Sequence, residues 1–420
     1  MSNSPRTRTV LSCTLVAALG AGATACGGRP DHPLSAAPYD AASQVVFNNS
    51  SGTGKVDPDQ PLEIISKGGK QGRITDVTAT DAAGRFVAGR LAADGTRWHT
   101  TTPLAAGEHY TVRVSTENTD GSPGRKVLAF DTGVPSKKRE LEVTFGPEEG
   151  KYGVGQPIIA ELSEEVTDKA TRVTIERGLR VDSQPSVEGS WYWVDDQTLH
   201  YRPKEYWPVN ASVRAHSNLK GIKLGERLWG GNSADLKITT GDRIVAVTDA
   251  SAHTMTVYRN GEEINTIPVT TGKPGFETRN GIKVVLGKEY FVRMRGTSVG
   301  IAEGTSESYN LPVYYATRVT WSGEYVHAAP WSVSSHGSAN VSHGCTGMST
   351  GNAAWFYETI SQGDLVKVVN SYGDDMNAFG NGYGDWNLDW DEWQEGSAAI
   401  GNPAKRTPPA TQLARLRPQV

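Results

Sequence analysis

The sequence is poor in cysteine, has no long apolar run and carries no excess of basic residues. With 3 Cys among 420 residues, it cannot be a small scaffold held together by disulfides. No segment reaches the ~20 apolar residues that a membrane-spanning helix needs, which excludes a polytopic membrane protein. The 42 Lys and Arg are balanced by 46 Asp and Glu, and no basic block is present. No nucleic-acid partner is therefore expected.

Glycine and proline are abundant instead. The 47 Gly and 22 Pro together form about 16% of the chain, against ~12% in average proteins. This excess favours turn-rich β structure over helical bundles. The length predicts two to four domains.

The first 26 residues have the pattern of a bacterial export signal. Arg6 and Arg8 form a basic start, and a weakly apolar stretch ends in Ala23-Thr24-Ala25-Cys26. This ending resembles a lipobox, in which the cysteine becomes the lipid-modified first residue of the mature protein. We expect residues 1–25 to be removed and Cys26 to be lipidated. The protein would then be exported and anchored at the outer face of the cytoplasmic membrane. Cleavage without lipidation is the alternative, because alanine begins the tetrapeptide where leucine is usual.

Removal of this segment would leave a single thiol. Cys13 lies in the predicted signal and Cys26 is the predicted lipid site, so Cys345 is the remaining cysteine. A lone thiol outside the membrane cannot form an internal disulfide. It is therefore either an inert buried thiol or a reactive one.

The next part of the chain predicts a linker and two immunoglobulin-like β-sandwich domains. Residues 26–43 form a linker rich in Pro, Ala and Ser. Short alternating segments separated by Gly- and Asp-rich turns over 44–139 and 140–241 predict the two sandwiches. The expected strands include residues 62–65, 110–114, 141–145, 158–162 and 173–175. Core packing explains the aromatic residues of the second domain, and carbohydrate binding is the alternative. These residues are Trp191, Tyr192, Trp193 and Trp207.

Residues 242–370 are expected to form a third, mostly β module. Asn260-Gly261 between two alternating segments is a strong signal for a type I′ hairpin. One helix is expected at about 351–361, with Ser349 or Thr350 as its N-cap. The expected strands lie at 254–258, 263–267, 282–286, 290–294 and 313–320.

The end of the chain divides into two short segments. Residues 371–401 are acidic and aromatic, and the spacings of four and three between Trp386, Trp390 and Trp393 place these side chains on one helical face. We expect an irregular segment or short helix docked on the third domain. Residues 402–420 are Pro-rich and basic and are expected to be disordered.

Chemistry-bearing residues concentrate between positions 327 and 345. His327, His336 and His343 lie within 17 residues, and Cys345 ends the stretch. A cysteine nucleophile needs a base to form thiolate and N–H groups directed at the developing oxyanion. Metal binding is the rival use of these residue types. However, no second thiol is available, and the histidine spacings fit none of the compact zinc patterns. No metal is expected.

The same stretch carries a resemblance to a known family. Tyr325-Val326-His327-Ala328-Ala329-Pro330-Trp331 followed by Ser342-His343-Gly344-Cys345 resembles the signature of the L,D-transpeptidase (YkuD-type) catalytic domain. The interval of 18 residues from His327 to Cys345 fits that signature. The resemblance covers about residues 242–370. It extends to the architecture, because exported actinobacterial members similarly carry two immunoglobulin-like domains and a Trp-rich C-terminal segment. The expected fold is therefore mainly β, with two β-sandwiches before a YkuD-like catalytic domain.

The resemblance implies a role for each matching residue. Cys345 would be the nucleophile, and His327 would be the general base, oriented by the backbone carbonyl of Ala328. His343 and the amides of Gly344 and Cys345 would shape the oxyanion site. The implied substrate-binding residues are Tyr309, Met294, Trp331, Ser322 and Ser342. His336 is expected to be a solvated residue of the lid. One departure is Gly347, where the family commonly has Asn or Arg.

The implied reaction is a two-step acyl transfer between peptidoglycan stem peptides, without a cofactor. Cys345 would attack a donor tetrapeptide stem, release D-Ala and pass the acyl group to the side-chain amine of an acceptor stem, giving a 3→3 cross-link. Carbapenems are expected to acylate Cys345. Two alternatives remain: an L,D-carboxypeptidase that hydrolyses the same thioester, and an inactive wall-binding lipoprotein, for which Gly347 is the suspicious feature.

Overall fold

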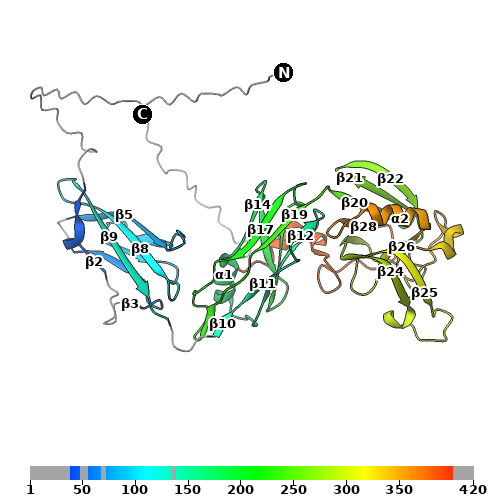
Figure 1. Cartoon of the computed structure of the whole chain (residues 1–420), viewed down its shortest axis with the longest axis horizontal. Helices are drawn as coiled ribbons and strands as arrows, with labels where there is room; N and C mark the ends of the chain where they lie inside the picture. The colour runs from blue at the N-terminus through cyan, green and yellow to red at the C-terminus, as the bar shows by residue number, and fades with distance from the viewer. Residues whose placement is uncertain (1–37, 48–54, 68–71, 135–138, 401–420) are drawn as a thin grey trace, which may run out of the picture.

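The computed structural model describes residues 38–47, 55–67, 72–134 and 139–400. The predicted signal segment, Cys26 and the tail at 402–420 lie outside these residues. The described part is mainly β, as expected, and forms three bodies arranged along the long axis of the molecule (Figure 1). No helix in these ranges is long and apolar enough to cross a membrane.

The first body is a sandwich of two sheets. One sheet has the order β1-β9-β8-β5, with β3 beside β9, and the other has the order β2-β4-β7-β6. Apolar side chains such as Ile64, Trp98 and Val112 fill the space between them. A short turn of helix, η2 (Ala41–Ser43), joins β1 to β2. The strands of the first sheet are β1 (Tyr39–Asp40), β3 (Lys55–Val56), β5 (Arg73–Asp81), β8 (His109–Glu117) and β9 (Pro123–Thr132). Those of the second are β2 (Val45–Phe47), β4 (Glu63–Ser66), β6 (Gly89–Leu91) and β7 (Arg97–Thr100).

The second body is also a sandwich, with sheet orders β11-β13-β16-β15 and β12-β19-β17-β14. Trp191, Trp193 and Trp207 are buried in its core, which confirms the packing interpretation of these residues. A further parallel pair, β10 (Arg139–Leu141) with β18 (Leu228–Gly230), lies toward the first body. The strands of one sheet are β11 (Val143–Gly146), β13 (Ile158–Leu162), β15 (Gly189–Trp193) and β16 (Thr198–Pro203). Those of the other are β12 (Gly150–Tyr152), β14 (Leu179–Gln184), β17 (Ser212–Ser217) and β19 (Leu236–Thr240).

The strand expected at 173–175 is wrong, because these residues belong to helix α1 (Lys169–Gly178). The Asp168 side chain accepts a hydrogen bond from Thr171 N at 2.7 Å and so caps the first turn. Ile175 is fully buried in the core of the second domain. A cap and one buried apolar side chain therefore override the β preference of three branched or hydroxyl-bearing residues.

The third body consists of two sheets with the helix α2 (Thr350–Thr359) packed on β25 and β26. Its sheet orders are β22-β21-β20-β28-β23 and β24-β25-β26-β27. The hairpin prediction is confirmed, because Asn260 and Gly261 have φ values of 54° and 97°, as a type I′ turn requires. The helix prediction is also confirmed, with Ser349 as the N-cap. The first sheet contains β20 (Ile244–Asp249), β21 (Thr254–Arg259), β22 (Glu262–Pro268), β23 (Gly281–Val284) and β28 (Leu365–Val369). The second contains β24 (Gly287–Arg295), β25 (Asn310–Arg318), β26 (Tyr325–Ala328) and β27 (Thr346–Met348), with η3 (Gly296–Val299) and η4 (Pro330–Ser335) in its loops.

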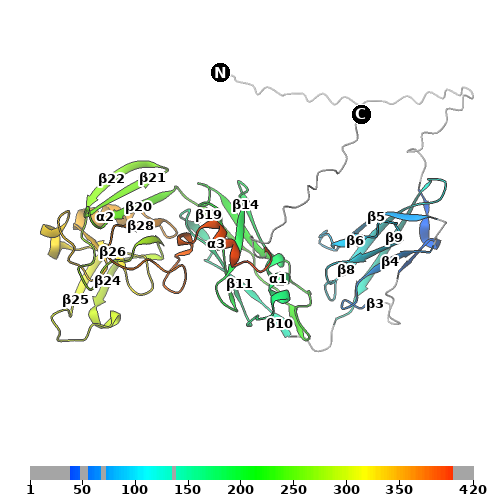
Figure 2. The same cartoon turned by 180° about the vertical axis from the view of Figure 1, so that it is seen from behind.

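The C-terminal segment docks on the second domain as well as on the third, which corrects the expectation of the third alone (Figure 2). Asp385 Oδ1 lies 2.7 Å from His200 Nδ1 of the second domain, and Asn387 Oδ1 accepts from Ile282 N of the third at 2.7 Å. The three tryptophans do not share one helix, because Trp386 lies in η5 (Asp385–Asn387) and the other two lie in α3 (Trp390–Glu395). They instead surround one cation. The guanidinium of Arg202 lies 4.6–5.5 Å from the ring centroids of Trp386, Trp390 and Trp393.

Candidate active site

The two halves of the predicted catalytic motif meet on adjacent parallel strands. His327 lies on β26 and is paired with Gly347 of β27, two residues after Cys345. The chain between these strands passes through η4 and returns to the same edge of the sheet. Two residues 18 positions apart are therefore neighbours, because parallel pairing requires a crossover of about this length.

Most of the predicted site residues line one cavity of about 260 Å³. Apolar side chains, including Leu311 and Val313, form much of its wall. The predicted residues that line it are Cys345, His327, His343, Met294, Tyr309, Trp331 and Ser342. The structure thus gathers the candidate nucleophile, the candidate base and a partly apolar binding surface in one place.

His327 is buried and held by one backbone contact. Its Nδ1 lies 2.8 Å from the carbonyl oxygen of Ala328. Because a carbonyl oxygen only accepts, Nδ1 carries the proton and the neutral ring keeps Nε2 as a base. Burial lowers the pKa of His327 to about 4, so the imidazole is neutral at physiological pH. The arrangement places the Ala328 carbonyl as the motif implied.

The sulfur of Cys345 lies against the turn that precedes β26. Its Sγ donates a hydrogen bond to the carbonyl oxygen of Gly323 at 3.5 Å, and the backbone N–H of Tyr325 donates to the sulfur. Burial raises the pKa of the Cys345 thiol to about 12. The resting site therefore holds a neutral thiol and a neutral imidazole. Gly323 was absent from the predicted site, because no local motif marks a contact 22 residues away.

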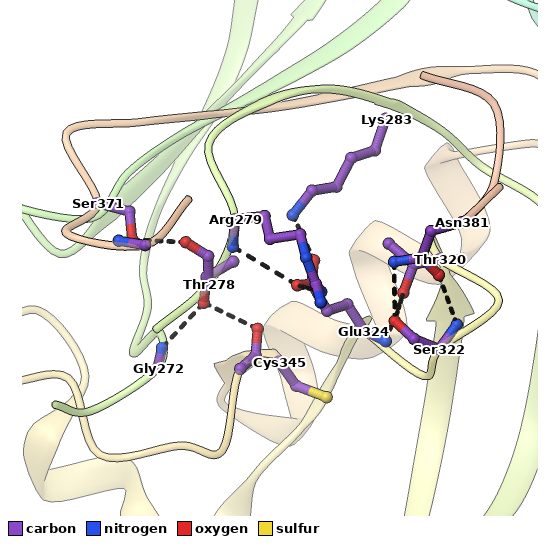
Figure 3. Close-up of polar contacts among 12 residues, drawn as sticks. Gly272, Thr278, Arg279, Lys283, Thr320, Ser322, Glu324, Cys345, Ser371 and Asn381 are labelled. Carbon is purple, nitrogen blue, oxygen red and sulfur yellow. Dashed lines mark hydrogen bonds and ion pairs between the residues drawn. The ribbon is translucent and has the colours of Figure 1, made fainter. Parts of the chain in front are cut away.

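The backbone next to Cys345 offers one amide to an oxyanion rather than the expected two. Gly344 N donates to Ser342 Oγ at 3.1 Å, and that hydroxyl donates to the Cys345 carbonyl at 2.6 Å. The amide of Cys345 has no partner among the described residues. Thr278 Oγ1 donates to the Gly344 carbonyl at 2.8 Å and so helps to fix the backbone before Cys345 (Figure 3).

The ring of His343 contacts the rings of Phe276 and Tyr309 and the carboxylate of Glu307. Its ring centroid lies 4.7 Å from that of Phe276 and 5.0 Å from that of Tyr309. Its Nε2 lies 2.7 Å from Glu307 Oε2, which also pairs with Lys273. The hydrogen bonds from Lys273 and then His343 hold the pKa of Glu307 below its usual value. His343 is thus fixed in orientation at the cavity wall.

Two predicted lid residues lie apart from the catalytic cavity. Ser322 is exposed and lines a second cavity of about 520 Å³, which His343 and Gly344 also line. His336 is half-buried and lies 3.3 Å from Ser332 Oγ through its Nε2. In the part of the chain that the structure describes, no group of three or more His, Cys, Asp or Glu is placed to hold a metal ion.

Comparison with known proteins identifies two matching family models. Residues 243–368 match the L,D-transpeptidase catalytic domain (YkuD), and residues 53–223 match a bacterial immunoglobulin domain (Big_10). The chain is 32% identical over 399 residues to L,D-transpeptidase 2 of Mycobacterium tuberculosis, covering 93% of this chain and 96% of that protein.

Two solved structures are similar to part of the chain. One is the LD transpeptidase LdtMt1 in complex with imipenem, 37% identical with a TM-score of 0.47, covering 56% of this chain and all of that one. The other is L,D-transpeptidase 3 of M. tuberculosis with a faropenem-derived adduct, 32% identical with a TM-score of 0.46, covering 54% and 97% of the two chains.

The raised pKa of the thiol predicts the pH dependence of its alkylation. In the folded protein from residue 38, the rate at which iodoacetamide modifies Cys345 should rise about tenfold per pH unit from pH 7 to 10 without a plateau, because only thiolate reacts. In concentrated urea the rate should level off near the ordinary pKa of 9.0. Intact-protein mass spectrometry measures both profiles. A plateau below pH 9 in the folded protein would contradict the neutral resting pair.

Proposed function

Because the chain belongs to the L,D-transpeptidase family, we propose that it cross-links peptidoglycan stem peptides by acyl transfer through Cys345. The observation that carries this proposal is the presence of Cys345 and the oriented imidazole of His327 in one partly apolar cavity. A wall-binding protein without catalytic activity would not require a thiol and an oriented imidazole in the same cavity.

Acylation begins with the neutral pair. As the carbonyl carbon of a donor tetrapeptide stem approaches Sγ of Cys345, the thiol proton passes to Nε2 of His327. The carbonyl oxygen becomes an oxyanion, which the Cys345 N–H stabilises. The tetrahedral intermediate collapses to a thioester, and the C–N bond to the terminal D-Ala breaks. The departing amine takes the proton from His327.

Deacylation reverses the roles of these groups. The side-chain amine of an acceptor stem attacks the thioester carbonyl and gives a proton to His327. The C–S bond breaks, the sulfur recovers that proton, and a 3→3 peptide bond remains. The apolar lining by Met294, Leu311 and Val313 disfavours water as the competing nucleophile. Aminolysis is therefore preferred over the hydrolysis that a carboxypeptidase would perform.

The reaction predicts a product that depends on Cys345. Incubation of the protein from residue 38 with a purified disaccharide-tetrapeptide should give a cross-linked dimer that lacks one D-Ala, detected by mass spectrometry. Cys345→Ala should give none, and His327→Ala should reduce the rate by at least ~10², the contribution usual for a general base. Tripeptide alone would reassign the protein as a carboxypeptidase. No product from the unmodified protein with any diamino acid stem would overturn the proposal.

We further propose that carbapenems acylate the same thiol. The strained β-lactam carbonyl meets Sγ as the stem carbonyl does, and its C–N bond opens as the leaving group takes the His327 proton. Intact-protein mass spectrometry should show the mass of one whole carbapenem added to the unmodified protein and none added to Cys345→Ala. An adduct of equal yield on the variant would contradict this assignment.

Membrane anchoring through Cys26 is a separate proposal that the lipobox-like tetrapeptide supports. Two acyl chains on this cysteine would hold the protein stably at the outer face of the membrane. The two immunoglobulin-like domains, arranged in line with the catalytic domain, would act as a spacer toward the wall (Figure 1).

If Cys26 carries the lipid anchor, replacing its sulfur with oxygen should release the protein from the membrane. In a bacterial host that lipidates exported proteins, Cys26→Ser should move the protein from the membrane fraction to the soluble fraction or the medium. Cys13→Ser is the matched control and should leave it with the membrane. Immunoblots of the fractions measure both. Membrane retention of Cys26→Ser would show that the anchor lies elsewhere.

A further inference from the structure

The turn formed by residues 320–324 holds the sulfur of Cys345 in the resting site. The Gly323 carbonyl oxygen accepts a hydrogen bond from the thiol at an S–O distance of 3.5 Å. Gly323 has a φ of +104°, a conformation that side chains disfavour, so the direction of this carbonyl depends on the shape of the turn. A feature that fixes the turn therefore also fixes the contact with the thiol.

One end of the turn is fixed from inside the third domain. The carboxylate of Glu324 pairs with Lys283, which is 1% exposed, and with Arg279 at 2.7 Å (Figure 3). The backbone N–H of Glu324 donates to Thr320 Oγ1 at 2.8 Å and closes the turn. After this point, Tyr325 enters β26 and is paired with Arg318. The Tyr325 amide that donates to the sulfur is thus held by the sheet.

The middle of the turn is fixed by the C-terminal segment. Asn381 Oδ1 accepts from Ser322 N at 2.8 Å, and Asn381 Nδ2 donates to Ser322 Oγ at 2.9 Å (Figure 3). The Asn381 side chain, 59 residues away in the sequence, thus fixes the position of Ser322. Ser322 in turn directly precedes Gly323, whose carbonyl contacts the thiol.

Asn381 is itself anchored through the second domain. A few residues later, Asp385 pairs with buried His200, and Trp386 Nε1 donates to the Gly155 carbonyl at 2.8 Å. Both partners belong to the second sandwich. The hydrogen bonds of Asn381 therefore connect the catalytic turn to a neighbouring domain through a continuous, packed segment.

We propose that Asn381 is a positioning residue for Cys345, which keeps the Gly323 carbonyl directed at the thiol and so maintains the protonated resting state. A carbonyl oxygen accepts from a thiol but repels a thiolate, so this contact favours the proton-bearing form. The inference rests on the proposed function only in taking Cys345 as the nucleophile.

The titratable groups around the sulfur are independent of position 381. They come from several elements, and an uncharged substitution at Asn381 leaves their charges in place. These groups are Lys283, Glu324, Tyr309, Tyr325, His327 and His343. A change in thiol ionisation in such a variant would therefore report the lost contact rather than an altered charge.

The test uses residues 26–420 carrying Cys26→Ser, so that Cys345 is the one thiol. The thiolate fraction is read from the rate at which iodoacetamide alkylates Cys345 at pH 8, followed by intact-protein mass spectrometry, with Cys345→Ala as the blank. Asn381→Ala should raise the thiolate fraction by about three- to tenfold, since one pKa unit changes it tenfold below the midpoint. Ser322→Ala, which loses one of the two hydrogen bonds, should give a smaller rise.

Asn377→Ala is the matched control, because Asn377 is an exposed asparagine of the same segment. Its thiolate fraction and its thermal unfolding midpoint should equal those of the parent. An unchanged thiolate fraction in both Asn381→Ala and Ser322→Ala, with unchanged unfolding midpoints, would overturn the proposal. The readout needs no peptidoglycan, so a failure to cross-link stem peptides would count against the proposed function alone.

Discussion

Burial of Cys345 beside His327 is the constraint on which the site depends. It raises the pKa of the thiol to about 12 and lowers that of the imidazole to about 4, so neither group is charged at neutral pH. An ion pair formed before substrate binding would lie in a cavity that solvates both ions poorly. In the proposed acyl transfer, charge develops as a carbonyl carbon accepts the sulfur electron pair. Proton transfer and attack are therefore coupled, and reagents in solution meet a thiol of low reactivity.

A buried nucleophile needs fixed surroundings, and their support reaches beyond the catalytic domain. Val284 and Leu365 of the third domain pack within the core of the second, so the two domains share apolar contacts. Across the same junction, Arg202 lies among three tryptophans and donates to the Leu388 carbonyl at 2.8 Å. Arg202 is 2% exposed, and this desolvation lowers its pKa to about 10. The second domain is therefore part of the support for the catalytic turn.

The features that could be predicted from the sequence have local causes. The Asn260-Gly261 turn and the Ser349 cap each act within a few residues. The histidine and cysteine of the motif were recognisable through their resemblance to the L,D-transpeptidase signature, and the pairing of β26 with β27 brings them together. The strand expected at 173–175 was wrong because an N-cap five residues earlier and tertiary burial decided the structure.

The features that were missed are contacts over long sequence separations. Glu307 meets His343 from 36 residues away, and Asn381 meets Ser322 from 59 residues away. A carboxylate or an amide at such a distance has no periodicity or spacing that distinguishes it from a surface residue. The docking of the C-terminal segment was partly missed for the same reason, since its partners His200 and Arg202 belong to a strand nearly two hundred positions earlier.

Gly347, the departure from the family pattern, has a steric reason within the structure. A Cβ at this position would lie 2.9 Å from the Ala329 Cβ and 3.1 Å from Cγ2 of Thr270. Gly347 also exchanges two backbone hydrogen bonds with Thr270, so its backbone has little freedom to withdraw. A side chain there requires the wall of the cavity to move. In the proposed function, orientation of the stem peptide therefore depends on groups that already face the cavity, such as the rings of His343 and Tyr309, whose centroids lie 5.0 Å apart with their planes tilted by 39°.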